Sequence, residues 1–551
     1  MSMEKQWKRK YLSYRELKEY GYERPYSFLM QTYLKVHHAM WLRKKLKEEN
    51  KYLNEMYENI DSNIVLDEVQ RKVIVCEEDH IFIVAGAGSG KTTTIVSKVK
   101  YLLEKRGILA ERLLIITYTN QAVNELKQRL HEMVGDSVKV MTFHKFCFDL
   151  IQAYDHEYYV CEDDSEIILD AIFEWKQTHQ KQYERLHYFY YDEFEVSVDH
   201  PRSFLKKCQK FISQFLELGY VLDDFIMWKK QYLNKQSILL FIECIEWVYM
   251  RYLNILKESD MVTFSQMVRN ARDILMTHEI KFSYEYIFID EFQDISKIRY
   301  QLIRTLMEQF HVKTICVGDD FQAIYSFAGS DVKFFFDQMN YPYGMEVFYI
   351  VNTYRNSQQL ITIAGEFIME NKLQLKKKLR SSCQENFPIA LFPYQGDINS
   401  ILRHILKEIY LFHKRASILF LGRYQFDEKL IWETGLFTKK EERIFCALYP
   451  SLDFIFYTVH QSKGLGFDEV ILLNASKGRY GFPTEVEADR IDQILRQDNT
   501  KDQCLEERRL FYVALTRTKH KVYILYPKYR ASSFVREIQK KKHVETKEVV
   551  S

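Results

Sequence analysis

Proline and glycine are scarce in this sequence, with 8 Pro and 18 Gly among 551 residues. So few turn-forming residues leave no obvious linker, internal repeat or low-complexity tract. No stretch approaches the roughly 20 apolar residues of a membrane span, and the basic first residues lack the apolar core of a signal peptide. We therefore expect a soluble, cytoplasmic protein with no membrane partner.

Clustered cysteine and an excess charge of one sign are also lacking. The nine cysteines are scattered, with no C-x-x-C pair and no Cys/His group at ligand spacing. This pattern argues against zinc and iron–sulfur sites. The formal net charge is only +2, so a basic groove for nucleic acid would have to be a local feature that the net charge hides.

Short apolar runs followed by helix-like segments make up most of the chain. Runs such as 81–84, 113–116, 286–289 and 346–350 are typical of strands that a parallel sheet buries on both faces. The chain is also too long for one ordinary domain. The predicted division is a helical N-terminal extension over 1–62, a first α/β domain over 63–345 with a helical insertion at about 151–258, and a second α/β domain over 346–540.

A glycine-rich loop follows the first of these runs. Its glycines let backbone N–H groups close around phosphate oxygens at a helix N-terminus. Lys91 can reach the β- and γ-phosphates, and the Thr92 hydroxyl can bind Mg²⁺. Ala85 stands where the general pattern has Gly, but the phosphate-facing glycines remain. The predicted nucleotide-binding residues of this loop are Gly86, Gly88, Ser89, Gly90, Lys91, Thr92 and Thr93.

An acidic pair, Asp290-Glu291, ends the apolar run 286–289. Asp290 is placed to hold Mg²⁺, and Glu291 to orient and deprotonate an attacking water. Alone, the pair would equally suit a surface turn. Together with the phosphate loop it predicts a hydrolase that uses ATP and Mg²⁺, with Thr92 and Asp290 on the metal.

These motifs, and others that follow in order between about residues 64 and 530, resemble the superfamily 1 helicases of the UvrD/Rep type. The resemblance implies two RecA-like P-loop NTPase domains with parallel sheets. It also implies ATP-driven movement, 3′ to 5′, on single-stranded DNA or on DNA with a single-stranded tail. Within the family, the stretches 290–296, 318–329 and 481–483 resemble the branch of bacterial DNA helicase IV.

The resemblance assigns roles around the nucleotide. Gln70 would read the adenine edge and Tyr354 would stack on the adenine. Gln322 would sense the γ-phosphate, while Arg355 and Arg517 would approach the phosphates from the second domain. The predicted catalytic set is Asp290, Glu291, Gln322, Arg355 and Arg517.

The resemblance also assigns DNA contacts. Thr119, Asn120 and His144 would contact phosphates, although a satisfied buried histidine is an alternative for His144. Aromatic rings would stack on bases, and core packing is the alternative for each ring. The predicted stacking rings are Tyr118, Phe143, Tyr325 and Phe327, and His460 of the motif at 458–464 is a further predicted DNA contact.

Three departures from the family pattern bear on function. Phe327-Ala328 stand where many relatives have Trp-Arg, and Gly466 replaces the usual Glu, which puts the expected ribose contact in question. Only about 105 positions separate Arg355 from His460, too few for the large regulatory subdomain of UvrD and Rep proteins. Two alternatives to a free-standing helicase therefore stay open: a motor that displaces proteins without unwinding, and a motor subunit whose partner nuclease does the cutting.

Overall fold

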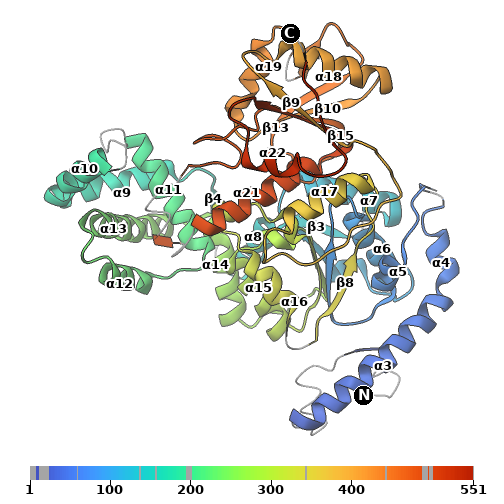
Figure 1. The fold of residues 1–551 in the computed structure, drawn as a ribbon. Helices are drawn as coiled ribbons and strands as arrows, with labels where there is room; N and C mark the ends of the chain where they lie inside the picture. The colour runs from blue at the N-terminus through green and yellow to red at the C-terminus, as the bar shows by residue number, and fades with distance from the viewer. Residues whose placement is uncertain are drawn as a thin grey trace.

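The computed structural model describes residues 8–10, 24–58, 60–61, 63–135, 138–154, 158–193, 201–341, 344–440, 443–486, 494–495 and 500–549. Much of the first part of the predicted N-terminal extension, residues 1–7 and 11–23, lies outside them. The described chain forms two sheets, a helical arm and an N-terminal helix, α3 (Arg24–Glu48), which α4 (Asn50–Glu55) follows. In Figure 1 the second sheet lies above the first, the arm extends to the left, and α3 lies at the lower right.

The first sheet has six parallel strands in the order β3-β2-β6-β7-β1-β8. Its strands are buried on both faces because helices cover both sides. Alternate residues point to opposite faces, so Phe82 and Val84 enter one core while Ile81 and Ile83 enter the other. The strands are β1 (His80–Ala85), β2 (Leu113–Thr117), β3 (Lys139–Thr142), β6 (Tyr286–Ile289), β7 (Lys313–Gly318) and β8 (Glu346–Ile350).

Two groups of helices cover this sheet. The core that contains Ile83 is closed by α5 (Glu68–Val75), α6 (Lys91–Glu104) and α7 (Asn120–Val134). The core that contains Phe82 is closed by α8 (Phe143–Tyr154), α14 (Phe264–Thr277), α15 (Lys297–Gln309) and α16 (Val332–Met339).

Strand β8 corrects one predicted boundary. Residues 346–350 were expected to open the second domain, but β8 pairs in parallel with β1, with Ile83 opposite Phe348. An apolar run of five residues shows that a strand is buried but not which sheet buries it. The chain therefore leaves the first sheet only after Ile350.

The second sheet has eight strands in the order β11-β12-β13-β10-β14-β15-β9-β16. The six from β13 to β16 run parallel, and an antiparallel hairpin, β11 and β12, extends one edge. The strands are β9 (Ile389–Tyr394), β10 (Ser417–Gly422), β11 (Phe437–Lys440), β12 (Arg443–Cys446), β13 (Asp453–Thr458), β14 (Phe467–Leu472), β15 (Thr518–Pro527) and β16 (Val544–Thr546). One face is covered by α17 (Gln358–Ile368), α21 (Thr500–Leu515) and α22 (Ser533–Ile538), and the other by α18 (Asn399–Phe412) and α19 (Lys429–Glu433).

A helical arm interrupts the first domain between β3 and β6. Its helices surround a core of their own that includes Trp175 and Trp228, both almost fully buried. At its root, β4 (Tyr159–Cys161) pairs with β5 (Met261–Thr263). The helices are α9 (Ser165–Thr178), α10 (Gln180–Glu193), α11 (Pro201–Glu217), α12 (Leu222–Gln231) and α13 (Gln236–Glu258).

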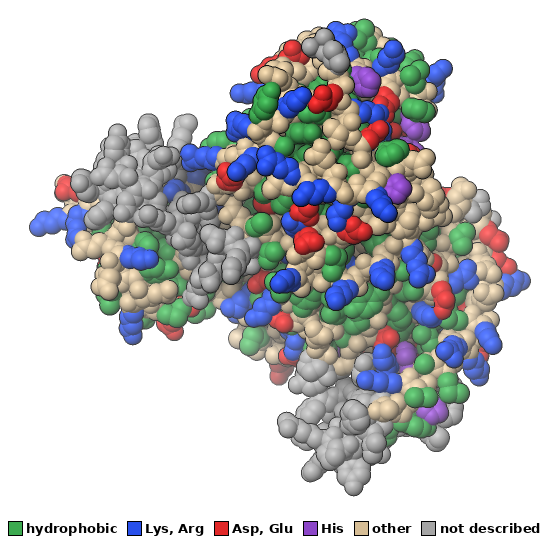
Figure 2. Space-filling view, in the orientation of Figure 1, with side chains coloured by type: hydrophobic (Ala, Val, Ile, Leu, Met, Phe, Trp, Pro, Cys, Tyr) green, Lys and Arg blue, Asp and Glu red, His purple; other side chains and the backbone are tan. Residues whose placement is uncertain are grey.

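The surface carries intermixed charges. Figure 2 shows Lys and Arg side chains spread over the visible face among Asp and Glu, in keeping with the small net charge. The basic residues Lys8, Arg9 and Lys10 form ion pairs with Glu77, Asp79 and Glu346 respectively. Within the described ranges, no helix combines the length and the apolar character needed to cross a membrane.

Candidate nucleotide and nucleic-acid sites

The phosphate loop lies between the end of β1 at Ala85 and the start of α6 at Lys91. Gly88 and Gly90 have φ of 68° and 79°, values that favour glycine. Gly90 is the N-cap of α6 and has no side chain with which to cap the first amides, which leaves that helix end open to an anion. The hydroxyl of Ser89 is buried and has no hydrogen-bond partner in the described part of the chain.

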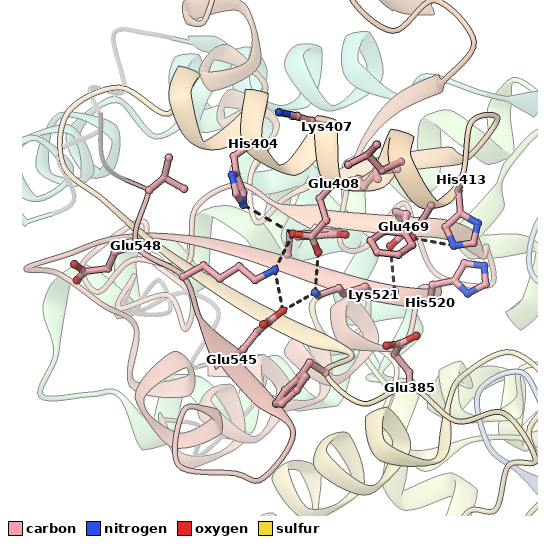
Figure 3. A pocket seen from close by; sticks show the side chains of 17 residues that line it. Glu385, His404, Lys407, Glu408, His413, Glu469, His520, Lys521, Glu545 and Glu548 are labelled. Carbon is pink, nitrogen blue, oxygen red and sulfur yellow. Dashed lines mark hydrogen bonds and ion pairs between the residues drawn. The ribbon is translucent and has the colours of Figure 1, made fainter.

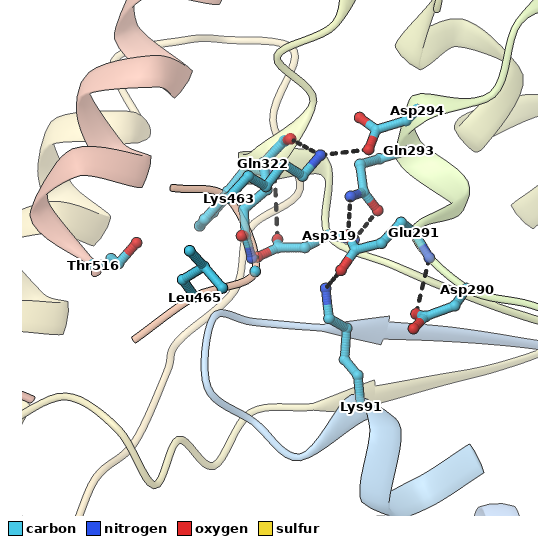
Figure 4. Close-up of polar contacts among 12 residues, drawn as sticks. Lys91, Asp290, Glu291, Gln293, Asp294, Asp319, Gln322, Lys463, Leu465 and Thr516 are labelled. Atoms are coloured by element: carbon cyan, nitrogen blue, oxygen red, sulfur yellow. Dashed lines mark hydrogen bonds and ion pairs between the residues drawn. The ribbon is translucent and has the colours of Figure 1, made fainter. Parts of the chain in front are cut away.

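Lys91 and Glu291 face one another across this loop. Lys91 Nζ lies 2.9 Å from Glu291 Oε1, and the backbone N–H of Glu291 donates to Asp290 Oδ1 at 2.9 Å (Figure 4). Burial would raise the pKa of Glu291, but Lys91 and Lys463 hold it below its ordinary value. Burial and the adjacent charge of Glu291 raise the pKa of Asp290. The loop lysine and the two acidic side chains thus form one coupled group.

A line of buried amides and carboxylates continues from Glu291. Gln293, fully buried, donates from Nε2 to Glu291 Oε2 and accepts from the backbone N–H of Asp319 at 2.9 Å. Asp319 in turn accepts from Gln322 Nε2 at 2.7 Å. Gln322 lies in the turn η3 (Asp320–Gln322), which follows β7. The predicted γ-phosphate sensor is therefore joined to the predicted catalytic base through Gln293 and Asp319, which were not among the predicted site residues.

Arg355 and Arg517 meet at this point from the second domain. Arg355 NH1 and Arg517 NH1 both donate to the carbonyl of Leu465, at 2.8 and 3.1 Å, and Arg517 NH2 donates to Gln322 Oε1 at 3.2 Å. Burial and the neighbouring Arg355 lower the pKa of Arg517 to about 9, and burial lowers that of Arg355. Among the described residues neither guanidinium forms an ion pair, so two cations stand close together and no carboxylate is paired with either.

Gly466 explains how Arg355 reaches this position. A Cβ atom at residue 466 would lie 2.9 Å from Arg355 Nε. The substitution that put the ribose contact in question thus leaves room for the guanidinium of Arg355.

Lys377 is a buried cation that was not predicted as a site residue. Its Nζ forms ion pairs with both Asp319 and Asp320 and lies 3.7 Å from the ring centroid of Phe321. In the sequence it is indistinguishable from its exposed neighbours Lys376 and Lys378.

The adenine side of the loop contains Gln70 and Tyr354. Gln70 is buried, and its Nε2 donates to the carbonyl of Ser89 at 3.4 Å and to Thr94 Oγ1 at 3.3 Å. Tyr354 is half exposed, and its backbone N–H donates to the carbonyl of Gly88 at 2.9 Å. Both therefore adjoin the phosphate loop, and their contacts with a base remain predictions.

The residues present fit ATP and Mg²⁺. The open helix end, the unpartnered Ser89 hydroxyl and the pair of guanidinium groups are suited to a polyanion. Thr92 and Thr93 lie in the first turn of α6, and Asp290 follows β6 directly. Thr92 and Asp290 would supply oxygen ligands to a magnesium ion bound there.

Two of the three predicted phosphate contacts for DNA, Thr119 and Asn120, lie at the carboxyl end of β2. Thr119 is the N-cap of α7 and accepts from the backbone N–H of Ala122 at 3.2 Å. Thr119 and Asn120 are exposed, and Tyr118 is partly buried beside them. An exposed helix N-terminus is suited to a backbone phosphate.

Phe143 is a correction to the predicted set of stacking rings. Its side chain is 1% exposed and belongs to the core of the first domain, so it offers no face to a base. The neighbouring His144 accepts from Arg299 NH2 at 3.2 Å. Burial and that guanidinium lower the pKa of His144 to about 4, so the side chain is neutral near pH 7. Arg299 also forms an ion pair with Glu217 of the arm.

Tyr325, Phe327 and His460 lie together where the two domains meet. The ring of Phe327, which is 49% exposed, lies 5.8 Å from that of Tyr325 and 5.2 Å from that of His460. Tyr325 donates from its hydroxyl to the carbonyl of His460 at 3.2 Å. The predicted track thus crosses from the first domain to the second.

A pocket of about 1070 Å³ lies elsewhere and is lined by residues of α18, β15 and β16 (Figure 3). Its charges pair internally, with Glu408 joined to Lys521 and Lys547. In the described residues no group of three or more His, Cys, Asp or Glu side chains is placed to hold a metal ion.

Comparison with known proteins assigns the chain to a family. Residues 66–341 match the model of the UvrD/REP helicase N-terminal domain, and residues 453–529 match the UvrD-like helicase C-terminal domain. The chain belongs to the UvrD/Rep helicase family. The two domains of this UvrD/Rep helicase contain the acidic pair and Arg517 respectively, so family and geometry agree.

Individual relatives are identical to this chain at about a quarter of the aligned residues. DNA helicase IV of Escherichia coli is 27% identical over 493 residues, which cover 85% of this chain and 69% of that protein. The putative ATP-dependent DNA helicase YjcD of Bacillus subtilis is 26% identical over 355 residues, covering 61% of this chain and 42% of its own. The ATP-dependent DNA helicase PcrA of Staphylococcus aureus is 24% identical over 387 residues, covering 66% and 48%. The matched part of this chain thus spans less than half of the last two proteins.

Proposed function

We propose that this chain is an ATP-dependent DNA helicase or translocase that moves along single-stranded DNA in the 3′ to 5′ direction. The observation that carries the proposal is the convergence of Lys91 and Glu291 from the first domain with Arg355 and Arg517 from the second. Phosphoryl transfer needs cations on the transferring phosphate and a base for the attacking water.

Each residue has a role in this mechanism. Lys91 and the amides of the loop bind the phosphates, and Thr92 and Asp290 hold Mg²⁺, which neutralises phosphate charge when bound. Glu291 accepts the proton of the attacking water. Arg355 and Arg517 stabilise the charge that develops on the phosphate oxygens. Gln322 contacts Arg517, and the loop that contains Gln322 continues to Tyr325 and Phe327. Through this loop, ATP hydrolysis is coupled to DNA binding.

Hydrolysis of ATP with and without single-stranded DNA tests the proposal, with Lys91→Ala as the control. Stimulation by DNA that disappears in Lys91→Ala supports a DNA-coupled motor. Absence of stimulation in a folded protein that binds ATP contradicts it. The direction is tested by comparing unwinding of a duplex that has a 3′ single-stranded tail with unwinding of a duplex that has a 5′ tail.

A second candidate is a motor that displaces bound proteins without separating strands. Between Arg355 and His460 the described residues form strands and helices of the second sheet, which favours a chain without the large regulatory subdomain. Release of streptavidin from a biotinylated single strand, with no product from forked DNA, would support this candidate. If neither product forms although ATP is hydrolysed, a partner such as a nuclease is required, and co-purification would identify it.

A further inference from the structure

Three exposed or partly exposed rings lie on the second domain outside the predicted sites. Phe426 is 46% exposed and Tyr480 is 52% exposed, and Tyr424 is partly buried. The rings of Tyr424 and Phe426 are parallel within 8°, with centroids 5.0 Å apart. Tyr480 meets both edge-on, at 5.7 and 5.8 Å.

Topology places these rings at the edge of the sheet that the predicted DNA track already occupies. Tyr424 follows β10, His460 follows β13 and Tyr480 follows β14. These three strands are parallel neighbours, so their carboxyl ends lie at the same edge, where ligands of α/β sheets bind. A hydrogen bond of 2.7 Å from the Tyr424 hydroxyl to Thr484 ties the loops after β10 and β14 together.

The cluster is continuous with the rings at the domain junction. Phe327 contacts His460, and the positive charge of Arg423 is close enough to His460 to help lower the pKa of its imidazole, after burial. The Arg423 guanidinium lies 4.7 Å from the ring centroid of Tyr424 and is fixed by Glu507. Arg479 lies 5.7 Å from the ring centroid of Tyr480. Aromatic faces between cations are the composition of a surface that binds single-stranded nucleic acid.

We infer that Tyr424, Phe426 and Tyr480 form a second base-stacking site for single-stranded DNA, which continues the track from Phe327 across the second domain. A base stacks on Phe426 against the edge of Tyr480, and Arg423 and Arg479 attract the flanking phosphates. The inference rests on the proposed function, because the occupant is the same strand.

The test uses Phe426→Ala and Tyr480→Ala in the full chain, with a fluorescent oligothymidylate as the probe. Since removal of a stacked ring costs about 1–3 kcal/mol per base, we expect binding to weaken by roughly tenfold for each variant. The DNA concentration for half-maximal ATPase stimulation should rise in parallel, while ATP hydrolysis without DNA stays unchanged. Phe426→Trp and Tyr480→Trp should retain the affinity of the wild type.

Phe412→Ala is the matched control, because Phe412 is 77% exposed and lines the pocket of Figure 3 instead. The stacking site would be overturned if Phe426→Ala, Tyr480→Ala and Phe412→Ala bound DNA with equal affinity while DNA still stimulated their ATP hydrolysis. The proposed motor function would then remain intact. The proposed function itself would be overturned if the wild-type protein did not bind DNA and its ATP hydrolysis were not stimulated by DNA.

Discussion

At the scale of single residues, the charged side chains of the predicted nucleotide site are of two kinds: Lys91 and Glu291 pair with each other, and two guanidinium groups form no ion pair in the described chain. The ammonium of Lys91 and the carboxylate of Glu291 neutralise each other at 2.9 Å. In the proposed mechanism, a phosphate bound at the loop gives Lys91 a second partner and so frees Glu291 to act on water. The two guanidinium groups on the carbonyl of Leu465 have no such partner within the described chain, which makes the site ready for a polyanion.

Replacement of Glu291 by Gln separates binding from turnover. The amide still accepts a hydrogen bond from Lys91 but cannot take a proton, so kcat should fall by about 10²–10⁴-fold, while affinity for a fluorescent ATP analogue is kept. Glu285→Gln, just before the other end of β6, is the control and should hydrolyse ATP normally. An equal loss of nucleotide affinity in Glu291→Gln would contradict its role as the base.

Lys377 gives a prediction about stability. Lys377→Met leaves Asp319 and Asp320 buried without their cation, which should cost about 3–5 kcal/mol. The exposed neighbours Lys376 and Lys378 provide matched controls, since surface substitutions usually change stability by less than about 0.5 kcal/mol. Denaturant unfolding measures the difference, and similar midpoints for all three Met variants would show that the buried ion pairs do not stabilise the fold.

At the scale of elements, strand β14 buries an ionisable group away from the nucleotide. Glu469 is 3% exposed and accepts from the backbone N–H of Lys521 at 3.1 Å. Burial raises the pKa of Glu469 to about 8, although Lys521 opposes the shift, and Asp468 and Glu385 add to it. His413 lies 3.9 Å from the same carboxyl group.

The stability of this region should therefore fall as the pH rises. The folded state keeps the proton of Glu469 up to about pH 8, whereas the unfolded state releases it near its ordinary pKa of about 4.3. Between these values the free energy of unfolding declines, by at most about 1.4 kcal/mol per pH unit. Glu469→Gln should flatten this slope in thermal unfolding at pH 6 and pH 8.5, and Glu548→Gln, exposed at the pocket, should not. The same slope in both variants would refute the assignment.

The elements also show what the sequence could predict. The phosphate loop was predictable because a strand, glycines and a helix start stand in one continuous segment, and the acidic pair because it directly follows an apolar strand. Which sheet contains β8 could not be predicted, because a strand buried on both faces has the same apolar sequence pattern in either sheet. The cluster of Tyr424, Phe426 and Tyr480 forms because the parallel strands β10 and β14 end at one edge of the sheet, and a separation of more than fifty residues hides this in the sequence. Phe143 was misassigned because a motif fixes a position in the chain and not the exposure of the ring.

At the scale of the whole molecule, the loop after β7 joins the two domains. Phe321 and Ile324 leave the first sheet and are buried in the core of the second. Lys463 of the second domain forms an ion pair with Asp294 of the first and donates to the carbonyl of Gln322 at 2.7 Å. The predicted nucleotide site and the predicted DNA track therefore share one interface, and we expect a change at either to affect the other.

Hydrogen exchange should detect this coupling. Because the site draws cations from both domains, a non-hydrolysable ATP analogue should slow amide exchange in residues 86–94 and, together with them, in 463–466 and 513–518. Glu291→Gln should show the same joint protection, since it keeps the phosphate-binding groups, and Lys91→Ala should lose it in both places. Protection confined to 86–94 would mean that the nucleotide binds to the first domain alone. In that case Arg355 and Arg517 would not act on the phosphates, and another source of coupling between ATP and DNA would have to be found.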